Sequence, residues 1–147
     1  MKLIFAPGTL NGIQRHGEES YPEEGAGLLL GKLQDQNRKV TDLMPLDNTF
    51  EGGKRKRRYL ISPEAMIEAE ERAEALGLEI LGVFHSHPDH PAQPSEFDRT
   101  WAWPWFAYVI TSIQNGQSEN SRAWLLKEDR SGFDEITLQA EHFQEVS

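Results

Sequence analysis

The sequence predicts a mixed α/β domain in which strands lie both before and after a central helix. Residues 63–76 carry the clearest helical pattern, with apolar residues at spacings of three and four. Short apolar runs bounded by turn residues precede and follow this helix, as the strands of a sheet require. The length of 147 residues suits one buried core, so we expect residues 1–147 to form a single domain.

The first part of the chain is expected to contain a short helix and three strands. Residues 9–20 can form the helix, although their apolar pattern is weak. The run "GAGLLLGKL" at residues 25–33 is bounded by glycines, which favours a buried strand. After the turn residues "QDQN", the next strands are expected at residues 38–48 and 58–62.

Local signals define both ends of the central helix. Ser62 is expected to be its N-cap and Pro63 its first residue, while Gly77 is expected to end it. Its apolar stripe consists of Met66, Ala69, Ala73 and Leu76. Residues 78–87 follow and are apolar enough for a strand that is buried on both faces.

The remainder of the chain is expected to return to the sheet after one more helix. "SEFDRTWAW" at residues 95–103 predicts a short helix with Ser95 as N-cap, and Pro104 lies beyond its end. The last strands are expected at residues 105–113, 121–127 and 133–139. The residues "NGQSEN" are expected to form the turn between the first two of these strands.

The composition argues against several classes of partner. The net charge of −9 disfavours nucleic acid, since phosphate binding needs an excess of lysine and arginine. No apolar stretch approaches the roughly 18 residues of a membrane span, and the N-terminus lacks the apolar core of a signal peptide, so we expect a cytoplasmic protein. Because the chain has no cysteine, any zinc site must use histidine and carboxylate ligands.

Two histidines mark the end of the strand predicted at residues 78–87. Alternate side chains of a strand point to the same side, so His85 and His87 should emerge together and could bind one cation. An isolated pair of this kind is more often two surface histidines. Asp98 could point back from the next helix as a third ligand, which leaves the fourth zinc position open as in catalytic sites. Alternatively, Asp98 is an acidic residue favoured by the dipole at a helix N-terminus.

A catalytic zinc site also needs a group that accepts and returns a proton. Glu23 and Glu24 come just before the buried strand at residues 25–33, and a carboxylate there could reach a site on a neighbouring strand. Two glutamates before a strand are more often a solvated edge of the sheet.

The sequence resembles the JAMM (MPN+, Mov34/JAB1) zinc metalloproteases. "HSHPDHPAQPSEFD" fits the pattern H-x-H-x₇-S-x₂-D without a gap. "YPEEGAGLLLG" resembles the N-terminal motif of the family, whose spacing selects Glu24 rather than Glu23. The similarity extends over roughly residues 20–113 and departs from many bacterial members at Ala26, where they have cysteine. Asp89 and His90 are not motif positions. Asp89 is assigned no chemistry, and His90 is expected to be a loop residue, although it could meet substrate or compete for the metal.

The resemblance implies a role for each motif residue and a particular fold. His85, His87 and Asp98 would hold one Zn²⁺ per chain. Glu24 would be the general base that takes a proton from the attacking water and passes it to the leaving amine. The Ser95 hydroxyl would hydrogen-bond the oxyanion. The fold would be a mainly antiparallel, curved sheet flanked by helices, with the layering of cytidine deaminases.

The resemblance also implies a class of substrate. Family members hydrolyse peptide or isopeptide bonds, and this short chain is similar to compact prokaryotic members. We therefore expect cleavage at the C-terminal tail of a ubiquitin-like sulfur-carrier protein, or of its C-terminal peptide adduct, with the tail bound along a sheet edge. A non-catalytic MPN scaffold and a zinc hydrolase of a small amide are the alternatives.

Two further segments have alternative interpretations. The basic cluster "KRKRR" at residues 54–58 could attract an acidic partner, although a solvated loop that protects a sheet edge is favoured. "WAWPW" at residues 101–105 could form an exposed recognition patch, although packing between helix and sheet is favoured.

Overall fold

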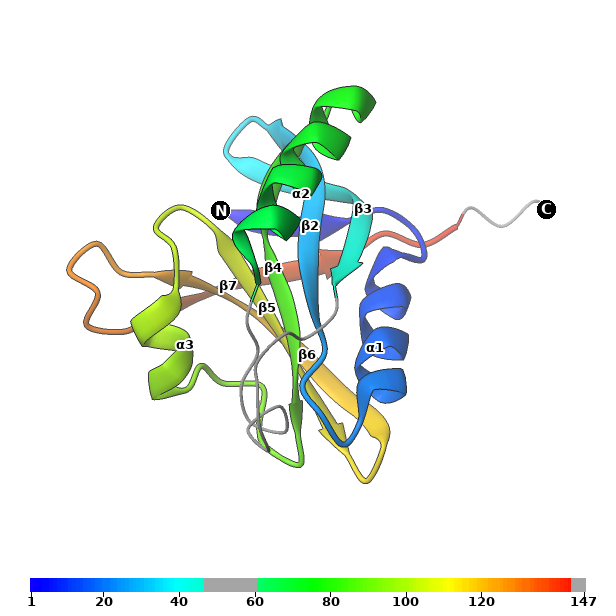
Figure 1. Cartoon of the computed structure of the whole chain (residues 1–147), viewed down its shortest axis with the longest axis vertical. Coiled ribbons are helices and arrows are strands. Elements are labelled where there is room, and N and C mark those ends of the chain that lie inside the picture. The colour runs from blue at the N-terminus through cyan, green and yellow to red at the C-terminus, as the bar shows by residue number, and fades with distance from the viewer. Residues whose placement is uncertain (47–60, 144–147) are drawn as a thin grey trace.

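The chain folds into a strongly curved sheet with helices packed against it (Figure 1). The computed structural model describes residues 1–46 and 61–143. In chain order, the elements are β1 (Lys2–Phe5), α1 (Thr9–Ser20), β2 (Ala26–Gln34), β3 (Asn37–Leu46), α2 (Pro63–Leu76), β4 (Glu79–Pro88), α3 (Glu96–Trp101), β5 (Ala107–Gln114), β6 (Gln117–Leu126) and β7 (Phe133–Ala140). Within the described residues, the strands form a closed barrel in the order β1-β3-β2-β4-β5-β6-β7.

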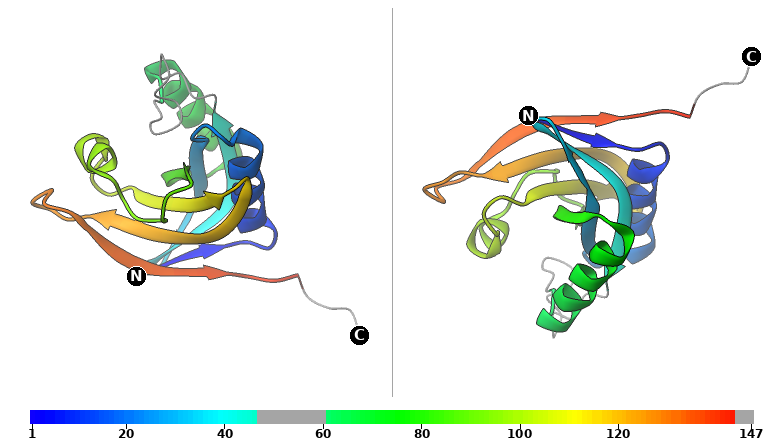
Figure 2. Two further views of the ribbon diagram at one scale, coloured as in Figure 1. Left: turned by 90° about the horizontal axis from the view of Figure 1, so that it is seen from below. Right: turned by 90° about the horizontal axis from the view of Figure 1, so that it is seen from above.

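The prediction of a mixed α/β fold with a mainly antiparallel, curved sheet is confirmed. β2 pairs antiparallel with β3 and β4, and β6 pairs antiparallel with β5 and β7. β4 and β5 are parallel, and β1 is parallel to both β3 and β7. The curvature goes further than the sequence indicates, because β1 joins the two ends of the sheet and closes it (Figure 2).

The sequence does not predict β1. Four residues are too few to show the alternation of a strand, and the neighbours of β1 lie far along the chain. Leu3 pairs with Arg38 on one side and with Leu138 on the other. Only these distant partners make the segment a strand.

The helices cover different sides of the sheet. Ile13 of α1 joins the apolar core inside the barrel, together with Phe5, Leu29 and Phe84. Residues of α2 pack on the other side of β2 and β4, where Met66 and Ala69 meet Leu28 and Val83. β4 is therefore buried on both faces, as its sequence predicts. In the described part of the chain, no helix has the length and apolar character needed to cross a membrane.

The bounds predicted for α2 are confirmed. The Ser62 hydroxyl accepts a hydrogen bond from the Ala65 amide at 3.1 Å, and Pro63 begins the helix. Gly77 ends it with φ of 69°, a left-handed conformation that glycine adopts without strain. The predicted stripe is wrong at its last residue, because Leu76 is half exposed.

Several other predicted bounds need correction. α3 stops at Trp101, and β5 starts only at Ala107 because Trp105 has φ of 76°. β6 includes most of the predicted "NGQSEN" turn, since Asn115 and Gly116 alone have the positive φ values of a two-residue hairpin.

Part of the predicted structure lies outside the described residues. The last two residues of the strand predicted at 38–48, the residues 58–60 and the basic cluster at 54–58 belong to this part. Of the strand predicted at 58–62, Ile61 and Ser62 are described, and they are not in a strand.

Candidate metal centre

The C-terminal end of β4 presents two histidine side chains together. His85 pairs with Ala26 of β2 on one side and with Ile110 of β5 on the other, so both neighbouring strands hold its backbone. His87 follows at the alternate position, and the two imidazole centroids are 4.9 Å apart. Both side chains are buried, so the alternative that His85 and His87 are two surface histidines is wrong.

The structure brings Asp98 to both histidines. Its Oδ1 lies 3.3 Å from His85 Nε2, and its Oδ2 lies 3.2 Å from His87 Nε2. α3 begins with a capping box: the Ser95 hydroxyl accepts from the Asp98 amide at 3.1 Å, and the Ser95 amide donates to Asp98 Oδ2 at 2.8 Å. Asp98 therefore caps its own helix, as one interpretation predicts, and it also contacts both histidines.

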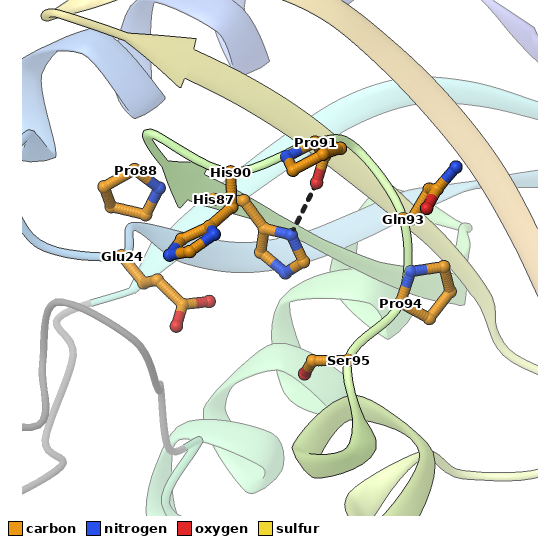
Figure 3. Close-up of a pocket in the computed structure, with 8 residues that line it drawn as sticks. All are labelled: Glu24, His87, Pro88, His90, Pro91, Gln93, Pro94 and Ser95. Carbon is orange, nitrogen blue, oxygen red and sulfur yellow. Dashed lines mark hydrogen bonds between the residues drawn. The ribbon is translucent and has the colours of Figure 1, made fainter.

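Hydrogen bonds at the far side of each imidazole orient the rings. His87 Nδ1 donates to the Pro91 carbonyl oxygen at 2.9 Å (Figure 3). His85 Nδ1 lies 3.2 Å from Glu24 Oε1 and donates to this carboxylate. With the Nδ1 atoms engaged in these hydrogen bonds, the Nε2 atom of each ring faces Asp98.

Glu24 is buried next to the histidines, whereas its neighbour Glu23 is exposed. The segment is held by β4, because Ser86 Oγ accepts from the Gly25 amide at 2.8 Å and the Ser86 amide donates to the Gly25 carbonyl at 3.0 Å. Ligand atoms of Glu24, His85 and His87 all lie within 4.8 Å of one another. The structure thus places Glu24, and not Glu23, at the site.

The surroundings of Asp98 keep its carboxylate charged. Burial by itself would raise the pKa of Asp98, but the charge of His85 and the hydrogen bond from His87 lower this pKa to about 2. Burial would likewise lower the pKa of His85, but the neighbouring Asp98 and Glu24 raise it. The centre therefore combines two buried carboxylates with two imidazoles.

This donor set fits a divalent cation. Two buried carboxylates need compensating positive charge, and a dication supplies it. Nitrogen and oxygen donors without cysteine suit zinc, and the group whose ligand atoms lie close enough to share one metal ion is Glu24, His85 and His87. The hydrogen bond from His85 to Glu24 matches the carboxylate contacts that orient histidine ligands of metals.

A pocket of about 410 Å³ opens beside the centre. It is lined by Glu24, His87, Pro88, His90, Pro91, Gln93, Pro94 and Ser95 (Figure 3). The Ser95 oxygen accepts the hydrogen bond of the capping box, so its O–H can donate to a group in the pocket. His90, which is not a motif position, lines the same pocket.

The structure also gives Asp89 a supporting role that the sequence does not indicate. Its Oδ2 accepts from the Tyr21 hydroxyl at 2.7 Å, and its Oδ1 accepts from the Asn115 amide at 2.9 Å. Tyr21 lies in the segment that leads to Glu24, and Asp89 lies just after the histidines. Asp89 therefore ties the two parts of the site together, and no sequence spacing could reveal this contact.

Comparison with known proteins agrees with the fold. The family model described as prokaryotic homologs of the JAB domain matches residues 8–127. The chain belongs to this prokaryotic JAB family. The resemblance to JAMM/MPN+ proteins is thereby confirmed, and the chain is a hydrolase of the JAMM type.

Two curated relatives of this family member have names that describe an activity. One, from Thermus thermophilus, is named a probable TtuB-protein conjugate cleaving protease and is 33% identical over 130 residues, covering 86% of this chain and 78% of the relative. The other, from Haloferax volcanii, is named a desampylase and is 31% identical over 116 residues, covering 76% of this chain and 81% of the relative.

Solved structures show the same fold. A solution structure of a Desulfitobacterium hafniense protein has a TM-score of 0.83 and 27% identity, and the match covers 97% of this chain and 95% of that one. A JAB1/MPN domain protein from Archaeoglobus fulgidus has a TM-score of 0.60 and 18% identity, and the match covers 95% of this chain and 97% of that one.

Proposed function

We propose that this JAB-family hydrolase is a zinc isopeptidase that cleaves conjugates at the C-terminal tail of a ubiquitin-like protein. The observation that carries the proposal is the Asp98 carboxylate between the two imidazoles, with Glu24 beside them at the edge of a pocket. The names of the two relatives support this class of substrate. A ubiquitin-like sulfur carrier, or its C-terminal peptide adduct, is the substrate that we propose specifically.

Three residues are proposed to hold the metal and two to carry out proton transfer and charge stabilisation. His85, His87 and Asp98 bind the zinc ion. When bound, zinc supplies a Lewis acid that polarises the scissile carbonyl and acidifies water at the site.

Glu24 is the proposed general base. A carboxylate has two oxygens, so Glu24 can hold His85 Nδ1 through Oε1 and still exchange a proton through Oε2. It accepts a proton from the attacking water and returns this proton to the nitrogen of the leaving amine. The same carboxylate thereby orients a metal ligand and transfers the proton.

Ser95 is the proposed donor to the oxyanion. Its position in the lining of the pocket and its available O–H suit a hydrogen bond to the carbonyl oxygen as negative charge develops there. This role is compatible with capping, because capping uses the oxygen of the hydroxyl as an acceptor.

The test is cleavage of a purified ubiquitin-like sulfur carrier joined to a lysine side chain through its C-terminus, with zinc measured in the same preparation. Glu24→Gln keeps an oxygen that accepts from His85 Nδ1, so it should retain zinc while kcat falls by about 100-fold or more. Glu23→Gln is the matched control, since this exposed neighbour should cleave like wild type. Full activity in Glu24→Gln would contradict the mechanism.

Zinc content and a substrate panel separate the alternatives. A scaffold would neither need one zinc ion per chain nor cleave any conjugate. A hydrolase of small amides would cleave amides that lack a ubiquitin-like protein, whereas the proposed enzyme should require the protein.

Two sequence-based predictions are also part of the proposal. We propose that residues 1–147 act as a single catalytic domain, which activity of the purified chain alone would test. We further propose a cytoplasmic location, which cell fractionation would test.

A further inference from the structure

Asp98 reaches the histidines from α3, which is only six residues long. A helix of this length has little stability of its own, because nucleation costs more than so few hydrogen bonds return. The capping box with Ser95 satisfies amides at its N-terminus. The carbonyls of the last turn need partners from elsewhere in the molecule.

Arg130, in the loop between β6 and β7, supplies these partners. Its Nη1 donates to the Ala102 carbonyl at 3.1 Å, and its Nη2 donates to the Arg99 and Thr100 carbonyls at 3.1 and 3.2 Å. In return, Arg99 Nη1 donates to the Arg130 carbonyl at 3.1 Å. A positive charge at a helix C-terminus is also favoured by the helix dipole.

The loop that carries Arg130 has internal hydrogen bonds that fix its shape. The Arg130 amide donates to the Lys127 carbonyl, and the Lys127 amide donates to the Gly132 carbonyl, both at 2.9 Å. The Ser131 hydroxyl and amide both donate to Asp129 Oδ1. The guanidinium thus projects from an ordered hairpin that is continuous with two strands of the barrel.

We infer that Arg130 is a positioning residue for Asp98, acting by fastening the C-terminus of α3 to the β6–β7 hairpin. The inference rests on the proposed function, in which Asp98 is a zinc ligand. The guanidinium holds three carbonyls at the end of the helix, the helix holds the capping box at its start, and the capping box holds the Asp98 carboxylate. Arg130 therefore acts on the Asp98 carboxylate through α3.

The experiment uses the full chain and measures two properties of Arg130→Ala. The zinc dissociation constant, determined by competition with a chelator, should rise by about tenfold, as when residues that orient metal ligands are lost. In the metal-free protein, the amides of α3 should exchange hydrogen faster than in wild type, while those of β4 keep their rates. A dissociation constant and α3 exchange rates equal to those of wild type would overturn the inference.

Arg122→Ala is the matched control. Arg122 also projects from this hairpin and forms two hydrogen bonds with Glu135, so its removal deletes the same charge without touching α3. It should leave zinc affinity and α3 exchange unchanged, and an equal loss in this variant would overturn the inference. If Arg130→Ala does not fold, Arg130→Lys is measured instead. A higher zinc dissociation constant and faster exchange of the α3 amides than in wild type support the inference, and wild-type values of both overturn it.

Asp98→Asn distinguishes failure of the inference from failure of the proposed function. If Asp98→Asn binds zinc as wild type does, Asp98 is not a ligand and both proposals are wrong. If it loses zinc while Arg130→Ala keeps wild-type affinity, only the positioning role of Arg130 is wrong.

Discussion

The two elements that supply the proposed zinc ligands, β4 and α3, are held in very different ways. β4 pairs with β2 and β5 along most of its length and is buried on both faces. α3 has six residues and is held by the capping box at one end and by Arg130 at the other. The histidines are thus positioned by the barrel, whereas the position of Asp98 depends on a few side-chain hydrogen bonds.

This difference implies that the two elements fail in different ways. A change in β4 disturbs the barrel and the global stability of the protein. A change at α3 disturbs the metal site while the barrel persists. The predictions that follow test this difference, beginning with the largest expected effect.

A methyl group added in β4 should destabilise the whole protein. A Cβ at Gly82 would collide with the carbonyl oxygen of Ala107 on β5. We expect Gly82→Ala to lower the free energy of unfolding by about 3 kcal/mol, measured by urea titration. Gly132→Ala is the control, since a Cβ there meets no atom within 4 Å. Similar stabilities of the two variants would contradict the view that β4 is tightly constrained.

The two serine N-caps should differ in their effect on catalysis. Ser62 and Ser95 each accept a hydrogen bond at 3.1 Å from the amide three residues later. Each change to alanine removes a cap worth about 1 kcal/mol. Only Ser95→Ala should also lower kcat, by about 100-fold, because one oxyanion donor is lost. Equal kcat values in the two variants, measured with saturating zinc, would remove Ser95 from the mechanism.

Removal of zinc should affect α3 more than β4. Zinc at about 100 times its dissociation constant favours the bound form by about 2.7 kcal/mol. Amides of α3 that open only without metal should then exchange about 100-fold faster after chelation. Those of β4 should change little, because pairing with β2 and β5 does not depend on the metal. Hydrogen exchange followed by mass spectrometry gives both rates, and equal acceleration in the two elements would refute the distinction.

The smallest effect is expected where β4 supports Glu24. Ser86→Ala leaves the buried Gly25 amide without its hydrogen-bond acceptor, which should cost about 1 kcal/mol of stability. Because the segment next to Glu24 loosens, kcat should fall while zinc affinity stays near that of wild type. Thr41→Ala, on the exposed side of β3, is the control for thermal unfolding and cleavage assays. A loss of zinc without a loss of kcat would contradict this role.

Much of the fold follows from signals that act within a few residues. The bounds of α2 are predictable because Ser62, Pro63 and Gly77 act on the adjacent backbone. β1 is not predictable, because Leu3 becomes part of a strand only through partners more than thirty residues away. The closure of the barrel cannot be predicted for the same reason, because β1 closes it through these distant partners.

The candidate site also has features that the sequence predicts and features that it does not. The spacing of His85, His87, Ser95 and Asp98 is readable in the sequence, and the spacing of the family motif selects Glu24 over Glu23. The contacts that hold these side chains are not readable. Ser86 of β4 reaches Gly25, which is 61 residues away in the chain, and Arg130 reaches α3 from another hairpin.

By itself, then, the sequence indicated which residues carry the proposed chemistry. The period of a strand placed His85 and His87 together, and the resemblance to the JAMM motif implied the roles of Glu24, Ser95 and Asp98. Only the tertiary structure decided how Asp98 is held against the histidines, how β1 closes the barrel and how Arg130 fastens α3. These contacts join residues that are remote in the chain, and no local pattern encodes the geometry of a hydrogen bond between such residues.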